Sequence, residues 1–164
     1  MRARDRALEA FARALLRRYG VVFRRMIERE ALAVSWYELG RVFRRWEASG
    51  EIRGGYFVGG VSGEQFALPE AIGSLRSIRK AEATGDLVVL SAADPLNLVG
   101  ILTPGRRIAA IAANRILLRD GVPLAALEGG QIVCLDSGAA EIDGEVQRAL
   151  TTGTLPAPLR PYYA

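Results

Sequence analysis

The chain has 164 residues, of which 50% are hydrophobic and 24% charged, a composition typical of one compact globular domain or two small ones. It contains no histidine, which excludes Ser-His or Cys-His catalytic mechanisms and most zinc sites. Its single cysteine, Cys134, excludes an internal disulfide and lies in an apolar run that predicts a small buried side chain.

Positive charge is concentrated at the start of the chain. Residues 1–53 carry 13 Arg against seven acidic residues, whereas residues 54–164 carry nine Lys or Arg against 11 acidic residues. A basic part beside a neutral-to-acidic part is expected of a module that binds a polyanion.

No segment predicts a membrane span or a secretory signal. The longest apolar runs, such as 87–90 and 108–113, are far shorter than the ~20 residues that a transmembrane helix needs. The first residues are charged and amphipathic, with no apolar signal region. We therefore expect a cytoplasmic protein with no membrane partner, and because the chain lacks histidine we also expect no metal site.

Apolar residues at three- and four-residue spacing predict a first helix over residues 4–19, which Gly20 ends. A shorter second helix is predicted over residues 23–30, with Phe23 on its inner face. Its outer face would carry three arginines: Arg24, Arg25 and Arg29.

The third helix has the best-marked start in the chain. Ser35 and Glu38 form a capping-box pattern, and Gly50 closes the helix. Its apolar stripe predicts a buried face made of Leu39, Val42, Phe43 and Trp46. The opposite side would carry Tyr37, Arg41, Arg44, Arg45 and Ala48.

Two β-prone runs, 51–53 and 56–58, flank Gly54-Gly55 and predict a hairpin, and residues 65–68 suggest one more strand. Three helices followed by such a hairpin are typical of a winged helix, a helix-turn-helix variant whose hairpin forms the wing.

Pro69 is well placed to start a connecting helix that runs to about Glu82. Short apolar or alternating runs follow, split by turn signals such as Asp120-Gly121 and Gly129-Gly130. The predicted strands are 87–91, 100–102, 107–111, 115–119, 122–127 and 131–135. Successive short strands of this kind favour a partly open barrel, before a last helix over residues 141–150.

The predicted fold class is therefore α+β. A winged helix-turn-helix domain covers residues 1–68, and a connecting helix covers residues 69–86. A small antiparallel β-barrel-like sheet covers residues 87–137, and a C-terminal helix with a Pro-rich tail covers residues 138–164.

Several stretches carry a resemblance to a known family. They are LRRYGVV (16–22), GEIRGGYFV (50–58), GEQFALPEA (63–71), SAADPLNLVGILTPG (91–105) and NRILLRDGVPLA (114–125). In this order they resemble the C-terminal region of large helicase-related (Lhr-type) superfamily 2 DNA helicases, from about residue 6 to the end of the chain. The layout is also similar to that of AlkZ/YcaQ-type winged-helix DNA glycosylases, although that likeness of architecture transfers no catalytic residue.

The resemblance implies a parent protein that is an ATP-dependent DNA helicase involved in DNA repair, with RecA-like motor domains. This chain has no G-x-x-x-x-G-K-[ST] phosphate loop and no acidic ATPase motif. ATP and Mg are therefore expected only in the parent motor domains, and no cofactor and no ATPase activity in this chain. The expected partners are single- or double-stranded DNA and the motor domains.

The third helix and its surroundings give the best candidates for DNA contact, because arginines bind phosphates or base edges and tyrosine can stack on bases. The candidate nucleic-acid-binding residues are Arg24, Arg25, Arg29, Tyr37, Arg41, Arg44, Arg45 and Arg53. A solvated charged face is the alternative for this helix. Trp46 is expected to be core packing, and Trp36 fits either packing or stacking.

Three functions remain open on the sequence. The favoured one is a non-catalytic nucleic-acid-binding accessory module of a helicase. The second is a DNA glycosylase-like domain acting on a flipped base, for which Glu64 and Asp94 are the candidate catalytic carboxylates. The third is a protein-interaction module that docks on the helicase body.

Overall fold

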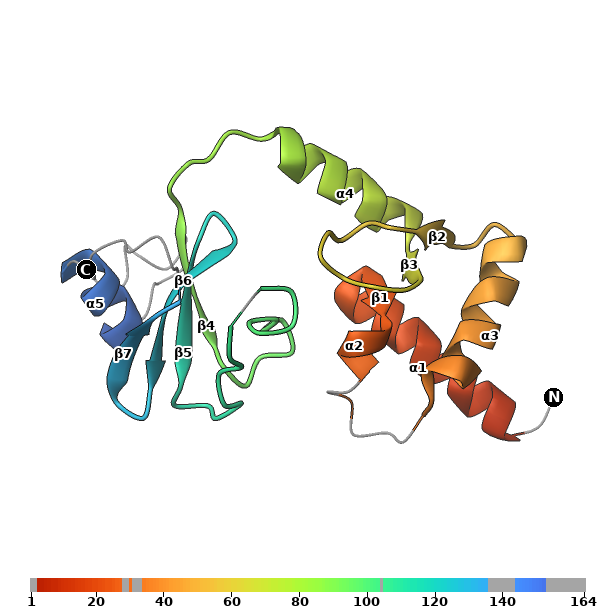
Figure 1. Ribbon diagram of the computed structural model, residues 1–164, viewed down its shortest axis with the longest axis horizontal. Coiled ribbons are helices and arrows are strands. Elements are labelled where there is room, and N and C mark those ends of the chain that lie inside the picture. Colours follow the sequence, from red (N-terminus) through yellow and green to blue (C-terminus); the bar gives the residue numbers. More distant parts are fainter. Residues whose placement is uncertain (1–2, 28–29, 31–33, 104, 136–143, 153–164) are drawn as a thin grey trace, which may run out of the picture. The chain divides into compact units, whose positions relative to one another are not determined.

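The computed structural model describes residues 3–27, 30, 34–103, 105–135 and 144–152 (Figure 1). The chain divides into two compact units, Met1–Ala81 and Glu82–Ala164. The predicted second-helix residue Arg29, the start of the predicted last helix and the Pro-rich tail lie outside the described residues. Among the described helices, none combines the length and the apolar character needed to cross a bilayer.

The first unit has the element order of a winged helix. A three-stranded antiparallel sheet, in the order β1-β3-β2, accompanies three helices, and a long loop between β2 and β3 forms the wing. The elements are α1 (Ala3–Tyr19), β1 (Val21–Phe23), α2 (Arg24–Ile27), α3 (Trp36–Ala48), β2 (Arg53–Gly55), β3 (Gln65–Ala67) and α4 (Pro69–Lys80). The α+β class and the winged helix are thus confirmed.

The core of this unit joins the inner faces of α1 and α3 to the sheet. Its members include Ala12, Leu15 and Leu16 of α1, the predicted inner residues of α3, and Phe66 of β3. Aromatic rings fill its centre: Phe43 lies 5.1 Å from Phe66 and 6.1 Å from Trp46, measured between ring centroids. Trp36 packs on Phe43 and Phe66, so its role here is packing.

Local signals set the ends of the helices. Gly20 follows α1 with a positive φ of 70°, as expected of a residue that ends a helix. The predicted capping box is formed. The Ser35 hydroxyl accepts a hydrogen bond from the Glu38 amide, and the Glu38 carboxylate accepts one from the Ser35 amide. Gly50, at a φ of 81°, follows the C-cap residue of α3.

The predicted start of the second helix is wrong. Phe23 belongs to strand β1, which pairs with β3 and places Phe23 opposite Gln65. Its side chain is buried, as the helix prediction also required, but α2 begins only at Arg24. A three-residue strand held by a distant partner has no signal of its own in the local sequence.

The predicted turn at Gly54-Gly55 is also wrong, because both glycines belong to β2. The Gly54 amide donates a 3.1 Å hydrogen bond to the Glu47 carboxylate of α3. A Cβ on Gly54 would lie 2.3 Å from that carboxylate oxygen. Gly54 therefore permits a close approach of strand and helix, and the wing is the longer loop of residues 56–64.

The second unit is built on a four-stranded antiparallel sheet in the order β4-β5-β6-β7. Its strands are β4 (Leu87–Ser91), β5 (Arg115–Arg119), β6 (Val122–Glu128) and β7 (Gln131–Cys134), followed by α5 (Gly144–Thr152). Two-residue turns join the last three strands at Asp120-Gly121 and Gly129-Gly130, all four residues having positive φ. These two predicted turns are confirmed.

The predicted small antiparallel sheet is confirmed, but it does not close into a barrel: within the described residues the sheet is open, with β4 and β7 at its edges. Residues 100–102 and 107–111 form no strands and belong to the connection between β4 and β5. This connection packs Val99 and Ile108 against Ile116 and Ala126, while α5 packs Val146 and Leu150 against Leu117. Covering both sides of the sheet buries its apolar residues without closing it.

Cys134, the last residue of β7, is exposed, so the expectation of a buried thiol is wrong. It is the last residue of β7, which lies at an edge of the four-stranded sheet within the described residues.

Candidate nucleic-acid interface

Helix α3 presents one stripe of side chains away from the core. Its inner residues are fixed by the aromatic core, and the residues at the opposite positions are exposed. Tyr37, Arg41 and Arg44 follow one another at spacings of four and three residues, so they share a face of the helix. Tyr37 is 71% exposed, a large value for an aromatic side chain. This face is free of the core and carries an aromatic ring beside two cations.

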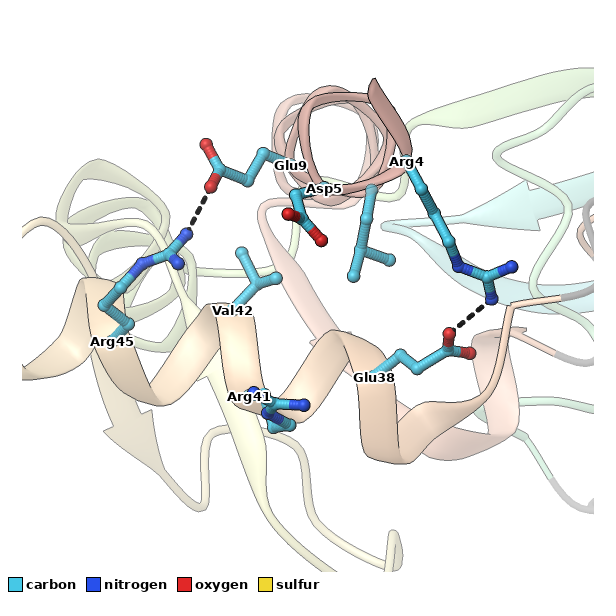
Figure 2. A pocket seen from close by; sticks show the side chains of 8 residues that line it. Arg4, Asp5, Glu9, Glu38, Arg41, Val42 and Arg45 are labelled. Atoms are coloured by element: carbon cyan, nitrogen blue, oxygen red, sulfur yellow. Dashed lines mark hydrogen bonds and ion pairs between the residues drawn. The ribbon is translucent and has the colours of Figure 1, made fainter. Parts of the chain in front are cut away.

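The flank of α3 toward α1 is occupied by ion pairs. Arg45 Nη2 lies 2.5 Å from Glu9 Oε1, and Arg4 Nη2 lies 2.6 Å from Glu38 Oε1. Figure 2 shows these pairs joining the two helices, and no dashed line reaches Arg41. Arg45 is thus held by the protein itself, a role that its sequence position did not predict.

A cleft of about 520 Å³ lies along this flank, between α1 and α3. Its charged lining consists of three arginines and three carboxylates: Arg4, Arg41, Arg45, Asp5, Glu9 and Glu38. The formal charges cancel, so the cleft itself has no excess charge with which to attract a phosphate. Arg41 is part of this lining and has no carboxylate partner among the described residues.

The pKa of the Glu38 carboxylate lies well below its ordinary value. The hydrogen bond from Arg4 lowers the pKa of Glu38 to about 2, and the bonds from the Ser35 amide and hydroxyl act in the same direction. The carboxylate therefore stays ionised at neutral pH, where it fixes the start of α3 and ties it to α1.

Arg44 reaches across to the end of the wing. Its Nη2 lies 2.5 Å from Glu64 Oε2, and both side chains are about half exposed. The hydrogen bond with Glu64 raises the pKa of Arg44 above its ordinary value. Glu64, one of the two candidate catalytic carboxylates, is therefore the ion-pair partner of a candidate DNA-binding residue.

Asp94, the other candidate carboxylate, lies in the second unit directly after β4. Its Oδ1 accepts the Leu96 amide at 2.8 Å, and its backbone carbonyl accepts the Asn97 amide. These bonds form a turn, in which the Asp94 carboxylate binds the backbone two residues further along, as Asp side chains commonly do.

The remaining candidates lie at the edges of the first unit. Arg24 and Arg25 open α2 and are exposed. Arg53 opens β2, and its Nη1 donates long hydrogen bonds to the carbonyl oxygens of Gly50 and Ile52. The guanidinium of Arg53 is thereby held beside the end of α3, with Nε and Nη2 directed to no acceptor among the described residues.

The wing depends on a residue that the sequence did not single out for this role. Gln65 is completely buried, and its side-chain oxygen accepts the amides of Phe57 and Val58 at 2.8 Å each. Its side-chain nitrogen donates to the carbonyl oxygens of Val58 and Val61. One feature of the sequence could have indicated this role: Gln65 is a polar residue at the start of an otherwise apolar strand, directly after a glycine-rich loop.

The helix–strand–helix–helix–strand–wing–strand order, with an exposed face on α3, defines the first unit as a winged-helix domain. A family model described as "Large helicase-related protein, winged-helix domain" matches residues 1–87. The chain belongs to this family.

Two relatives extend the likeness beyond the winged helix. The chain is 32% identical over 152 residues, 84% of its length, to a Mycolicibacterium smegmatis protein named "Lhr helicase/ probable uracil glycosylase". It is 33% identical over 127 residues, 76% of its length, to the Escherichia coli "Lhr helicase/uracil glycosylase". The chain spans only 10% and 8% of the lengths of these two proteins.

Proposed function

We propose that this chain is a nucleic-acid-binding accessory part of a DNA helicase, non-catalytic by itself, and that it contacts DNA through the outward face of α3 and the wing. The observation that carries the proposal is the exposed stripe of Tyr37, Arg41 and Arg44 on α3 of a winged helix. In helix-turn-helix proteins this helix is the one that enters the major groove.

The chemistry of the stripe suits a phosphate backbone. Arg41 has no competing carboxylate among the described residues and can donate to a phosphate without breaking an ion pair. Arg44 would exchange Glu64 for a phosphate, which is feasible because exposed ion pairs contribute only ~0–1 kcal/mol. Arg24 and Arg53 add positive charge at the edges of the same unit.

Membership of the large helicase-related family supports the proposal that this chain works as part of a helicase. The RecA-like motor domains of the parent protein, with their ATP and Mg, would be partners of the two units described above. We also propose a bacterial cytoplasmic location and a role in DNA repair, the latter because both relatives are named for a uracil glycosylase as well as a helicase.

The second candidate function is a glycosylase activity, favoured by the names of the two relatives. Both candidate carboxylates already have partners in this structure. Glu64 forms an ion pair with Arg44, and Asp94 accepts a hydrogen bond from a backbone amide of its own turn. A glycosylase needs a carboxylate beside a pocket that takes a flipped base. Excision of uracil from an oligonucleotide that disappears in Glu64→Gln or Asp94→Asn would favour this candidate over the accessory role.

The test compares two single substitutions that remove the same charge from the same unit. Arg41→Ala removes a cation from the exposed stripe, and Arg17→Ala, the control, removes one from α1, where Arg17 is exposed. Affinity for fluorescein-labelled duplex and single-stranded DNA is measured by anisotropy over a series of salt concentrations. We expect the slope of log K against log salt to become shallower by about 0.7–0.9 in Arg41→Ala only.

The other outcomes are equally decisive. Equal changes in both variants would mean that only net charge matters, and the assignment to α3 would be wrong. No binding of the wild-type chain to either DNA would favour a protein-interaction module instead.

A further inference from the structure

A second cleft lies on another side of the first unit, between β2, the wing and α4. It has a volume of about 430 Å³, within the range of small-molecule sites. Its lining includes Arg53 at the start of β2, Phe57 in the wing, and Pro69, Ile72, Gly73 and Arg76 on α4. The four residues of α4 recur at three- and four-residue spacing, so they form one face of this helix.

The lining combines two cations with apolar walls. Arg53 and Arg76 are exposed, and neither forms an ion pair with a carboxylate in the part of the chain that the structure describes. No acidic residue lines the cleft, in contrast to the charge-balanced cleft between α1 and α3. The cleft is thus complementary to an anion that also carries an apolar surface.

The walls of the cleft are held in place. Both the Phe57 amide and the next amide along the chain donate to buried Gln65, which fixes the backbone that carries the Phe57 ring. The ring lies over Gly55, since a Cβ on that glycine would be 3.1 Å from it. On the opposite wall, a Cβ on Gly73 would meet no atom within 4 Å, so there is open space above this helix position.

We propose that this cleft binds one unpaired nucleotide of a single strand, with the base between Phe57 and the Ile72–Gly73 surface and the flanking phosphates on Arg53 and Arg76. A base has an apolar face that stacks on aromatic side chains, and its phosphates are the anions that arginines bind. The proposal rests on the proposed function, because it requires this unit to bind nucleic acid. It adds a single-strand site that the α3 face does not provide.

The test uses the full chain and three substitutions on α4. Arg76→Ala removes a proposed phosphate contact, and Gly73→Leu fills the space of the base without changing charge. Arg79→Ala, the matched control, removes the same charge one turn further along the helix, outside the lining of the cleft. The probes are a fluorescein-labelled oligo(dT) of about 12 nucleotides and its duplex with oligo(dA).

We expect Arg76→Ala and Gly73→Leu each to weaken oligo(dT) binding by about fivefold or more, the loss of one stacked base or its phosphate contact. Arg79→Ala should change it by less than about twofold. Circular dichroism should show that all three variants fold, and Gly73→Leu should not melt earlier, because glycine inside a helix is a weak helix former.

The results separate the two proposals. If the chain binds DNA but the cleft variants bind as the Arg79→Ala control does, the cleft proposal is overturned and the proposed function stands. Equal losses on the duplex, or competition by oligo-glutamate as strong as that by oligo(dT), would also overturn it. No DNA binding by the wild type would overturn both.

Discussion

The buried Gln65 side chain shows how one residue organises the wing. Four hydrogen bonds join its amide group to the backbone of the wing loop, and it is completely buried. A buried amide with all its partners stabilises one conformation, because every alternative leaves a polar group without a partner. The glycine-rich loop is therefore held from inside the protein.

Replacing Gln65 should destabilise the unit. In Gln65→Leu the amides of Phe57 and Val58 lose their acceptor, which should lower the free energy of unfolding by about 1–3 kcal/mol. The control is Gln131→Leu, at an exposed position of β7, with an expected change below about 0.5 kcal/mol. Urea denaturation measures both. Equal effects would mean that the wing does not depend on Gln65.

Glu38 makes the stability of the chain depend on pH. Because the folded-state pKa of Glu38 is about 2 and its ordinary value is 4.5, the ionised carboxylate contributes stability above pH 4.5. That contribution is lost as the pH falls from 4.5 toward 2. The difference in unfolding free energy between the wild type and Glu38→Gln should therefore shrink over this range and be constant above it. A difference independent of pH would show that the carboxylate charge has no part in the cap.

At the scale of the elements, the sequence predicted what local chemistry determines. The capping box at Ser35 needs only residues three positions apart, and the two hairpin turns need only glycine and aspartate at positive φ. The stripe on α3 likewise follows from the helical period. These features form in almost any context that allows the element.

Elements that depend on distant partners were predicted wrongly. Gly54 is a strand residue because it pairs with Phe66 of β3 beyond the wing, and it also accommodates the Glu47 carboxylate; neither tertiary contact has a local signal. A partly open barrel was expected because a sheet of short strands must either close or be covered, and Val99 and Ile108 cover this sheet from an irregular connection. At the candidate site the exposure of the α3 arginines was predictable from the helical period. The ion pairs that Arg44 and Arg45 form with carboxylates of other elements were not.

The pairing of α3 with the wing leads to a prediction about Glu64. Glu64→Gln removes the carboxylate that holds Arg44 and one negative charge from the proposed interface. Affinity for DNA should rise by roughly two- to fivefold, since a weak exposed ion pair is no longer broken on binding. Glu70→Gln, an exposed carboxylate on α4, is the control for charge alone. Weaker binding in Glu64→Gln than in this control would contradict the ion-pair exchange.

At the scale of the whole chain, the charge asymmetry follows the division into two units. Residues 1–81 carry 16 Lys or Arg against nine acidic residues, whereas residues 82–164 carry six against nine. Each unit also has its own core: one joins α1, α3 and the three-stranded sheet, and the others lie on the four-stranded sheet. Separate cores are what allow parts of a chain to fold independently.

Residues 1–81 and 82–164, produced separately, should therefore each fold, and only the first should bind DNA. Phosphate contacts dominate such binding, so residues 1–81 should bind with an affinity within roughly threefold of the intact chain and with a similar salt dependence. Circular dichroism and thermal melting check folding, and anisotropy with the same labelled DNA measures binding. DNA binding by folded residues 82–164 as tight as that of the intact chain would move the interface to the four-stranded sheet. Binding that needs both units on one chain would mean that the interface includes residues from each.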